Sequence, residues 1–129
     1  MFDGRYWNPA LETASPSELR EMQAAKLRSQ LRCVLDQSPF YRGKFEEAGF
    51  DASRIRGVDD DLSRAPFTCK EDLRKSQVEH PPLGEHAAAG MEEVLRVHSS
   101  TGTTGRSSYV GITRHDREAW TEVVSRVYW

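Results

Sequence analysis

The sequence predicts a mixed α/β fold, in which N-terminal helices lead to a β-hairpin with a phosphate-binding loop and then to one further helix. Capping signals followed by spaced apolar residues occupy the first two-thirds of the 129 residues. Two short runs rich in β-branched and aromatic residues flank a glycine-rich stretch nearer the end, which indicates a hairpin. Helical spacing of apolar residues then returns.

The first long helix is predicted to begin after Ser15. The stretch Ser15-Pro16-Ser17-Glu18 combines a capping box with proline at the first helical position. Ser38-Pro39 is expected to end this helix and to begin a shorter one, which closes at Gly49 with Phe50 beyond it. The long helix carries an imperfect apolar stripe, made of Leu19, Met22, Leu27, Leu31, Val34 and Leu35.

Two further signals organise the middle of the chain. Thr68 and Glu71 have the spacing of a third capping box, which predicts another helix. The stretch from Gln77 to Gly90 contains a proline pair, a glycine and an alanine run, so we expect a loop that crosses toward the strands. The aromatic and methionine side chains of this helical part are interpreted as core residues rather than ligand contacts.

The hairpin strands are predicted at Leu95-Arg96-Val97-His98 and Tyr109-Val110-Gly111-Ile112. Between them, glycines let the backbone approach an anion closely, Ser and Thr hydroxyls and exposed N–H groups donate hydrogen bonds, and Arg106 supplies positive charge. We interpret the segment as a triphosphate-binding loop, against the alternative of a flexible turn that composition alone leaves open. The candidate phosphate-binding residues are Ser100, Thr101, Gly102, Thr103, Thr104, Gly105 and Arg106.

The spacing within this loop excludes three familiar motifs. Only Thr103 and Thr104 separate Gly102 from Gly105 and a strand follows, so the loop is not a Walker loop. It also lacks the glycine spacing of a dinucleotide fingerprint and the pattern of a nucleophile elbow. His98 beside Ser99 does not indicate a nucleophile with its base, because neighbours on a strand point to opposite faces. No catalytic residue is therefore assigned.

The last helix is predicted to begin with Thr113 as its N-cap and Asp116 three positions on. Trp120, Val123, Val124 and Val127 then form one apolar face at helical spacing. No capping glycine or terminal cation follows this helix, so we expect the 129 residues to be an N-terminal portion of a longer chain.

Composition argues against several other classes. The 18 basic and 20 acidic residues are scattered without a block, which disfavours a nucleic-acid surface. No apolar run reaches membrane-spanning length and Met1 to Arg5 does not begin a signal peptide, so we expect a cytoplasmic location. Cys33 and Cys69 are isolated and are expected to be thiols rather than zinc ligands or a disulfide. No metal site is expected.

The glycine-rich loop resembles the phosphate-binding signature of the adenylate-forming acyl-CoA synthetases. The wider chain is similar to one branch, the phenylacetate-CoA ligases. Three departures lie in the loop, where that family usually has Ser at Thr101, Lys at Arg106 and Pro at Ser107. The matching blocks, in order, are Tyr6-Trp7-Asn8-Pro9, Ser38-Pro39-Phe40-Tyr41-Arg42, Pro66-Phe67-Thr68, Lys70-Glu71-Asp72-Leu73-Arg74, Arg96-Val97-His98 and the loop itself.

The resemblance implies a two-step reaction. An aromatic carboxylic acid would attack the α-phosphate of ATP, with Mg²⁺, to give an acyl-adenylate and pyrophosphate, and coenzyme A would then displace AMP. It also implies that the chain is the N-terminal portion of the large adenylation domain, inactive by itself, with the remainder and a small C-terminal domain absent. A homodimer is what the family suggests.

A second hypothesis remains open from the sequence. The chain could instead be a non-enzymatic helical interaction module, or a truncated remnant whose loop does not bind nucleotide. The identity of the acid is not encoded in these residues.

Overall fold

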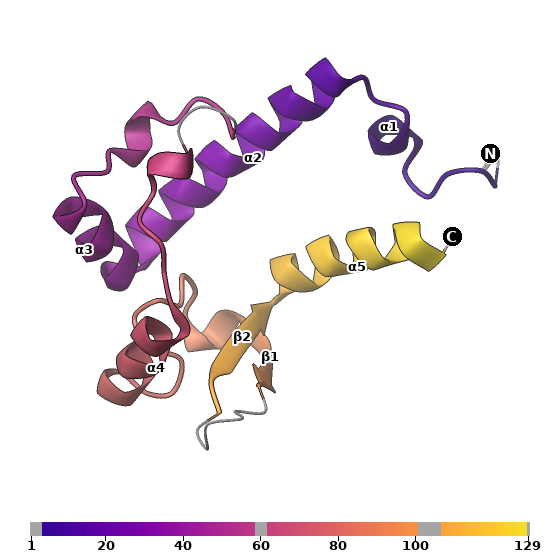
Figure 1. The fold of residues 1–129 in the computed structure, drawn as a ribbon. Helices are drawn as coiled ribbons and strands as arrows, with labels where there is room; N and C mark the ends of the chain where they lie inside the picture. Colours follow the sequence, from indigo (N-terminus) through magenta and orange to yellow (C-terminus); the bar gives the residue numbers. More distant parts are fainter. Residues whose placement is uncertain (1–3, 59–61, 101–106, 129) are drawn as a thin grey trace.

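The computed structural model describes residues 4–58, 62–100 and 107–128. It confirms the predicted mixture of helices leading to an antiparallel hairpin and a final helix (Figure 1). Short 3₁₀ turns η1, η2 and η3 cover Ala52–Arg54, Leu62–Arg64 and Met91–Glu93. The helices and strands are α1 (Pro9–Glu12), α2 (Pro16–Gln37), α3 (Pro39–Glu47), α4 (Lys70–Glu79), β1 (Val94–Ser99), β2 (Tyr109–Thr113) and α5 (Arg114–Tyr128).

The start of α2 is the predicted capping box. The Ser15 hydroxyl oxygen accepts from the backbone N–H of Glu18 at 3.3 Å, and the Glu18 carboxylate accepts from the backbone N–H of Ser15 at 2.8 Å. The backbone N–H groups of Ser15 and Glu18, at the N-terminal end of α2, thus both find acceptors within the capping box. Only the C-terminal part of the apolar stripe meets a core, where Leu31 is buried and Leu27 and Leu35 are half-buried.

Helix α3 ends in a Schellman motif at the predicted glycine. Gly49 has a φ of +60°, a conformation that glycine adopts without steric cost. The N–H of Gly49 donates to the carbonyl of Glu46 at 3.0 Å, and that of Phe50 donates to the carbonyl of Phe45 at 2.8 Å. The Phe45 and Phe50 rings meet edge to face with centroids 5.0 Å apart, which supplies the hydrophobic contact of this motif.

The buried core is small and lies between α2, α3 and η1. Leu31, Phe45 and Ile55 are its buried members. Because Leu31 lies in α2, Phe45 in α3 and Ile55 directly after η1, their burial packs α3 and the turn after it against the C-terminal half of α2. Partly buried residues packed around them are Leu27, Leu35, Tyr41, Phe50 and Ala52.

The predicted capping box at Thr68 and Glu71 is wrong by one position. The N-cap of α4 is Cys69, whose backbone N–H donates to the Asp72 carboxylate at 3.1 Å. The same carboxylate oxygen accepts from the Lys44 ammonium at 2.6 Å. This contact with α3 selects Asp72 as the residue that faces the helix start, which shifts the boundary by one residue.

The end of α4 also differs from the sequence prediction. The loop was expected to begin at Gln77, but α4 continues to Glu79. Gln77 therefore projects from the last turn of a helix, where neighbouring turns hold its backbone. The chain between α4 and η3 forms the crossing loop, residues 80–90, which we call the proline loop after its Pro81-Pro82 pair.

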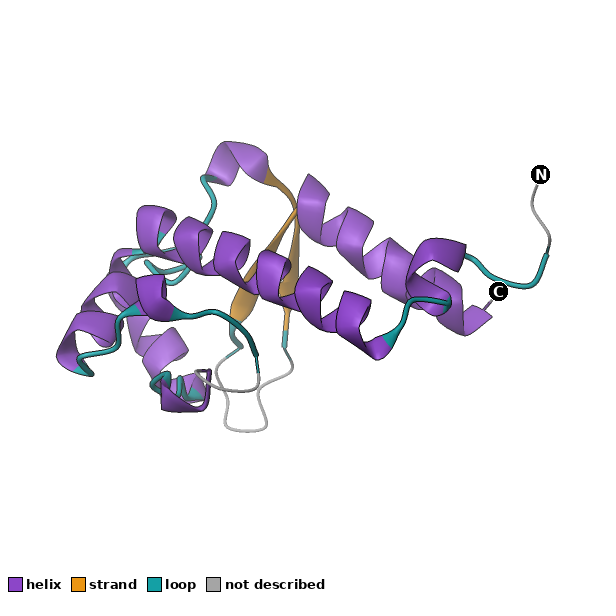
Figure 2. Cartoon of the chain, turned by 90° about the horizontal axis from the view of Figure 1, so that it is seen from above, coloured by secondary structure: helices purple, strands orange, loops and turns teal. Residues whose placement is uncertain are grey.

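Strands β1 and β2 pair antiparallel, as predicted, with Ser99 opposite Tyr109 and Val97 opposite Gly111. The register shifts between Val94 and Arg96, at the end of the hairpin nearest to η3. Figure 2 shows the two strands running side by side between α5 and the helical part of the chain. The hairpin therefore links the two parts, and its bend is the segment that the sequence assigns to phosphate binding.

Helix α5 begins with the predicted cap. The Thr113 N–H and hydroxyl both donate to the Asp116 carboxylate at 2.8 Å, and the Asp116 N–H donates to the Thr113 hydroxyl oxygen at 3.2 Å. Because Thr113 is also the last residue of β2, helix and strand are joined without a connecting loop. Part of the predicted apolar face meets β1, where the rings of Trp120 and His98 lie 5.8 Å apart.

The N-terminal segment is fastened to α5 by a network that sequence analysis did not predict. The Glu122 carboxylate accepts from the Trp7 indole N–H at 2.9 Å, from the Asn8 side-chain amide at 2.8 Å and from the Arg126 guanidinium at 2.8 Å. Figure 1 shows α1 lying between the start of α2 and the far end of α5. Hydrogen bonds from Arg126, Asn8 and Trp7 lower the pKa of Glu122 from its ordinary 4.5 to about 2.

This network predicts a pH-dependent stability. Because the folded pKa of Glu122 lies below its ordinary value, its contribution to the free energy of unfolding is full above pH 4.5 and is lost as pH falls toward 2. Urea unfolding should show Glu122→Gln less stable than the parent at neutral pH, with the difference closing below pH 4.5. Glu118→Gln, on the same helix, is the control. A Glu122→Gln difference that stays constant down to pH 2 would contradict the network.

Candidate functional site: the hairpin bend

The base of the hairpin bend is closed by two serines. The Ser100 N–H donates to the Ser108 carbonyl at 2.9 Å, and the two hydroxyls lie 2.8 Å apart. The Ser108 N–H also points to the Ser100 hydroxyl oxygen, at 3.3 Å. Of the predicted phosphate-binding residues, Ser100 is the one that the structure describes. Thr101, Gly102, Thr103, Thr104, Gly105 and Arg106 lie outside the described residues.

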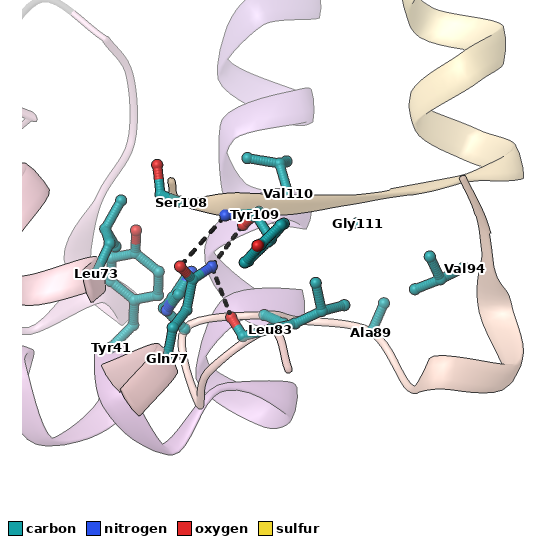
Figure 3. A pocket seen from close by; sticks show the side chains of 12 residues that line it. Tyr41, Leu73, Gln77, Leu83, Ala89, Val94, Ser108, Tyr109, Val110 and Gly111 are labelled. Atoms are coloured by element: carbon teal, nitrogen blue, oxygen red, sulfur yellow. Dashed lines mark hydrogen bonds between the residues drawn. The ribbon is translucent and has the colours of Figure 1, made fainter. Parts of the chain in front are cut away.

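The start of β2, which follows the bend, is held by Gln77 of α4, and Figure 3 shows this side chain facing the strand. Its amide nitrogen donates to the Tyr109 carbonyl at 2.5 Å and to the Leu83 carbonyl at 3.4 Å. Its amide oxygen accepts from the Tyr109 N–H at 3.3 Å. One side chain thus satisfies both backbone groups of the first residue of β2.

A second contact holds β2 against the proline loop. A side-chain carbon at Gly111 would lie 2.8 Å from the nearest methyl carbon of Leu83, closer than real contacts come, and 3.1 Å from Val94, which is unusually tight. Leu83 itself is buried. Glycine at this position therefore lets the strand pass directly over Leu83, and Figure 3 shows the Leu83 side chain beneath β2.

The proline loop is in turn anchored to the helices. The Ser38 hydroxyl, which is fully buried, donates to the Glu85 carbonyl at 2.7 Å. Its oxygen also accepts from the Tyr41 N–H at 3.3 Å, so one side chain caps α3 and secures the loop. The α2–α3 junction, the proline loop and β2 are therefore connected by part-buried contacts at Ser38 and Leu83, and the contacts of Gln77 with β2 lie nearer the surface.

A cavity of about 310 Å³ lies beside this arrangement. Its wall is mainly apolar, and Gln77 and Ser108 bring polar groups to it (Figure 3). His86 also borders the cavity; burial lowers its pKa, which favours the neutral imidazole. Apolar residues that line the cavity include Tyr41, Leu73, Leu83, Val94, Tyr109 and Val110.

The described residues offer no metal centre. Among residues 4–58, 62–100 and 107–128, no group of three His, Cys, Asp or Glu side chains could hold a metal ion. Cys33 and Cys69 are free thiols, as predicted. Hydrogen bonds from Lys44 and Cys69 lower the pKa of Asp72 to about 2, so this carboxylate serves as an ionised structural link between α3 and α4. In the same part of the chain, no helix is long and apolar enough to cross a membrane.

No protein-family model matches the chain. It is, however, 43% identical over 120 residues to the phenylacetate-coenzyme A ligase of Thermus thermophilus, a match that covers 93% of this chain and 26% of that protein. The corresponding enzymes of Pseudomonas putida and Escherichia coli are 40% and 38% identical over 116 residues. The chain thus spans about a quarter of the length of these relatives.

The solved structures that resemble this chain are also CoA ligases. A 2-hydroxyisobutyryl-CoA ligase in complex with 2-HIB-AMP and CoA superposes with a TM-score of 0.88 and 37% identity, covering all of this chain and 27% of that one. An open conformation of the same enzyme gives a TM-score of 0.87. The chain is therefore a homologue of the N-terminal part of the phenylacetate-CoA ligases, and its fold matches the corresponding part of an adenylate-forming CoA ligase.

Proposed function

We propose that this chain forms the N-terminal portion of the large adenylation domain of an AMP-forming ligase for an aromatic carboxylic acid. The enzyme would join the acid to the α-phosphate of ATP, release pyrophosphate, and transfer the acyl group from AMP to the thiol of coenzyme A. The observation that carries this proposal is the 43% identity to a phenylacetate-coenzyme A ligase over 93% of the chain. A structural neighbour whose complex holds both an acyl-AMP and CoA supports the same two steps.

Within this reaction, we assign the segment from Ser100 to Arg106 to the departing phosphates. Backbone N–H groups, hydroxyls and one guanidinium would stabilise the charge that develops on pyrophosphate as it leaves. The Ser100 N–H and hydroxyl are already paired with Ser108, so Ser100 closes the base of the loop and leaves Thr101 to Arg106 to supply the donors. A base held by these hydrogen bonds favours this role, because charge stabilisation is strongest when the donors are positioned in advance.

The remaining parts of the proposal concern the whole enzyme. Mg²⁺ would accompany ATP, and no residue of the described chain is assigned to it. We propose a cytoplasmic enzyme with ATP, CoA and an aryl acid as its small-molecule substrates, and a homodimeric assembly. The structural neighbours act on a small aliphatic hydroxy acid, as their names state, so 2-hydroxyisobutyrate is the alternative acid to test.

The experiment is a fusion in which this chain replaces the matching N-terminal part of the Thermus thermophilus relative. We expect exchange of labelled pyrophosphate into ATP that depends on phenylacetate or another aryl acid. Exchange only with 2-hydroxyisobutyrate would move the proposal to aliphatic acids. A folded fusion that shows no exchange with any acid, while the unaltered relative is active, would favour the interaction-module alternative.

A further inference from the structure

We infer that Gln77 is a positioning residue for nucleotide activation, acting on the hairpin bend through the backbone of Tyr109. The inference rests on the proposed phosphate-binding role of residues 100–106. Gln77 itself lies in the last turn of α4, 32 residues before Tyr109 in the chain.

The Gln77 side chain carries the donor and acceptor groups that the Tyr109 backbone needs, and we call this pair of hydrogen bonds the clasp. The backbone of a strand presents one N–H donor and one C=O acceptor per residue, and a primary amide carries the complementary pair. Gln77 uses its oxygen for the Tyr109 N–H and its nitrogen for the Tyr109 carbonyl, with the second N–H directed to Leu83. The side chain thus does for Tyr109 what a neighbouring strand would do.

The Gln77–Tyr109 contact lies directly after the hairpin bend, which is why we assign it to positioning the bend. Tyr109 is the first residue of β2 and follows Arg106 by three positions. Ser100 and Ser108 fasten the two arms of the bend to each other, but they do not fix the bend relative to the helices. Gln77 supplies such a restraint at the first residue of β2, beside the Gly111–Leu83 packing further along the strand, because α4 is tied to α3 through Asp72 and Lys44.

The expected effect follows from geometry. Displacing a reacting or stabilising group by about 1 Å can cost on the order of 100-fold in rate. Removing the clasp leaves the Ser100–Ser108 contacts and the Gly111–Leu83 packing, so a partial displacement is expected. We expect Gln77→Leu to lower kcat/KM for ATP in pyrophosphate exchange by about tenfold, with KM for the acid unchanged.

The two half-reactions separate positioning from general stability. Pyrophosphate has left before coenzyme A attacks, so thioester formation from a supplied acyl-adenylate does not need the phosphate-binding loop. In the fusion protein, Gln77→Leu should slow adenylation and leave this second step at the parental rate. Gln30→Leu, at an exposed position of α2, is the matched control and should change neither step. Equal losses in both half-reactions, or no loss in adenylation, would overturn the inference.

A glutamate at position 77 adds a readout by pH. An ionised carboxylate can accept from the Tyr109 N–H but faces two carbonyl oxygens, whereas its protonated form has one donor and one acceptor like the amide. Neighbouring carbonyl oxygens favour the protonated form and so raise the pKa of a glutamate above its ordinary value. The adenylation defect of Gln77→Glu, relative to the parent at each pH, should therefore shrink as pH falls toward about 5. A defect that is independent of pH would contradict the clasp.

A measurement without activity distinguishes failure of this inference from failure of the proposed function. In the 129-residue chain, Gln77→Leu should make the Tyr109 amide exchange its hydrogen with solvent several-fold faster, while the Phe50 amide in the α3 cap keeps its rate. Unchanged exchange at Tyr109 would show that the clasp does not form, whatever the enzyme does. Faster exchange together with an inactive parental fusion would instead reject the ligase proposal.

Discussion

Arg106→Ala is expected to reduce acid-dependent pyrophosphate exchange by roughly 100-fold, the loss typical of removing one donor that stabilises developing negative charge. Arg106 is the only cation between Ser99 and Ser107 in the sequence. If the segment holds the departing phosphates, its charge acts on the leaving group in adenylation and has no partner once pyrophosphate has gone. The loss should therefore appear in kcat/KM for ATP, measured with the fusion protein, and not in thioester formation from acyl-adenylate.

Two variants make this result specific. Arg106→Lys keeps the charge and restores the residue usual in the family that the loop resembles, so most of the activity should remain even though the planar fork is lost. Arg117→Ala removes an exposed arginine from α5 and should leave both half-reactions unchanged. Parental exchange in Arg106→Ala would remove the loop from the reaction. An equal loss in Arg106→Lys would show that the fork, rather than the charge, is what matters.

Phe45→Ala should destabilise the chain by about 3–5 kcal/mol, the range for deleting a buried aromatic side chain. Phe45 is 8% exposed, packs with Leu31 and Ile55, and forms the ring contact with Phe50 that closes α3. Because whole domains are stable by only about 5–15 kcal/mol, this single change should remove much of the cooperative unfolding transition. Urea denaturation followed by circular dichroism measures the difference.

Phe67 provides the matched control for this prediction. It is the same residue type but is 95% exposed, so Phe67→Ala should shift the free energy of unfolding by no more than about 0.5 kcal/mol. Similar unfolding midpoints for the two variants would show that the cluster around Phe45 does not hold the helices together.

The sequence was most informative where a structural signal is local. The capping pairs Ser15 with Glu18 and Thr113 with Asp116 lie three residues apart, and both formed as predicted. The box predicted at Thr68 failed because the choice between adjacent acidic residues was made by Lys44, 28 residues away. Residue spacing therefore predicts a helix cap correctly only when no charged side chain from elsewhere in the fold pairs with a neighbouring acidic residue.

The contacts that place the hairpin bend could not be read from the sequence. Ser38 and Gln77 bond to the carbonyls of Glu85 and Tyr109, and a backbone carbonyl is the same for every residue type. Nothing in the residue pattern therefore marks the partner. The phosphate-binding role of the bend came from resemblance to a family rather than from geometry, and it stays a prediction for the residues between Ser100 and Ser107.

Helix α5 shows a different limit. Its spacing correctly predicted an apolar side, and its members Trp120, Val123 and Val127 remain more than half exposed. Periodicity identifies which side of a helix avoids water, but the covering surface is a property of the tertiary structure.

The missing side chain at Gly111 has a consequence for how variants of this protein can differ in length. If β2 slid by one residue, Val110 or Ile112 would stand over Leu83, where even a single added carbon is too close. The close approach of Leu83 therefore disfavours this shift of register. We therefore expect insertions or deletions between Ser100 and Ser108 to change the length of the connecting segment and to leave the pairing of β1 with β2 in place.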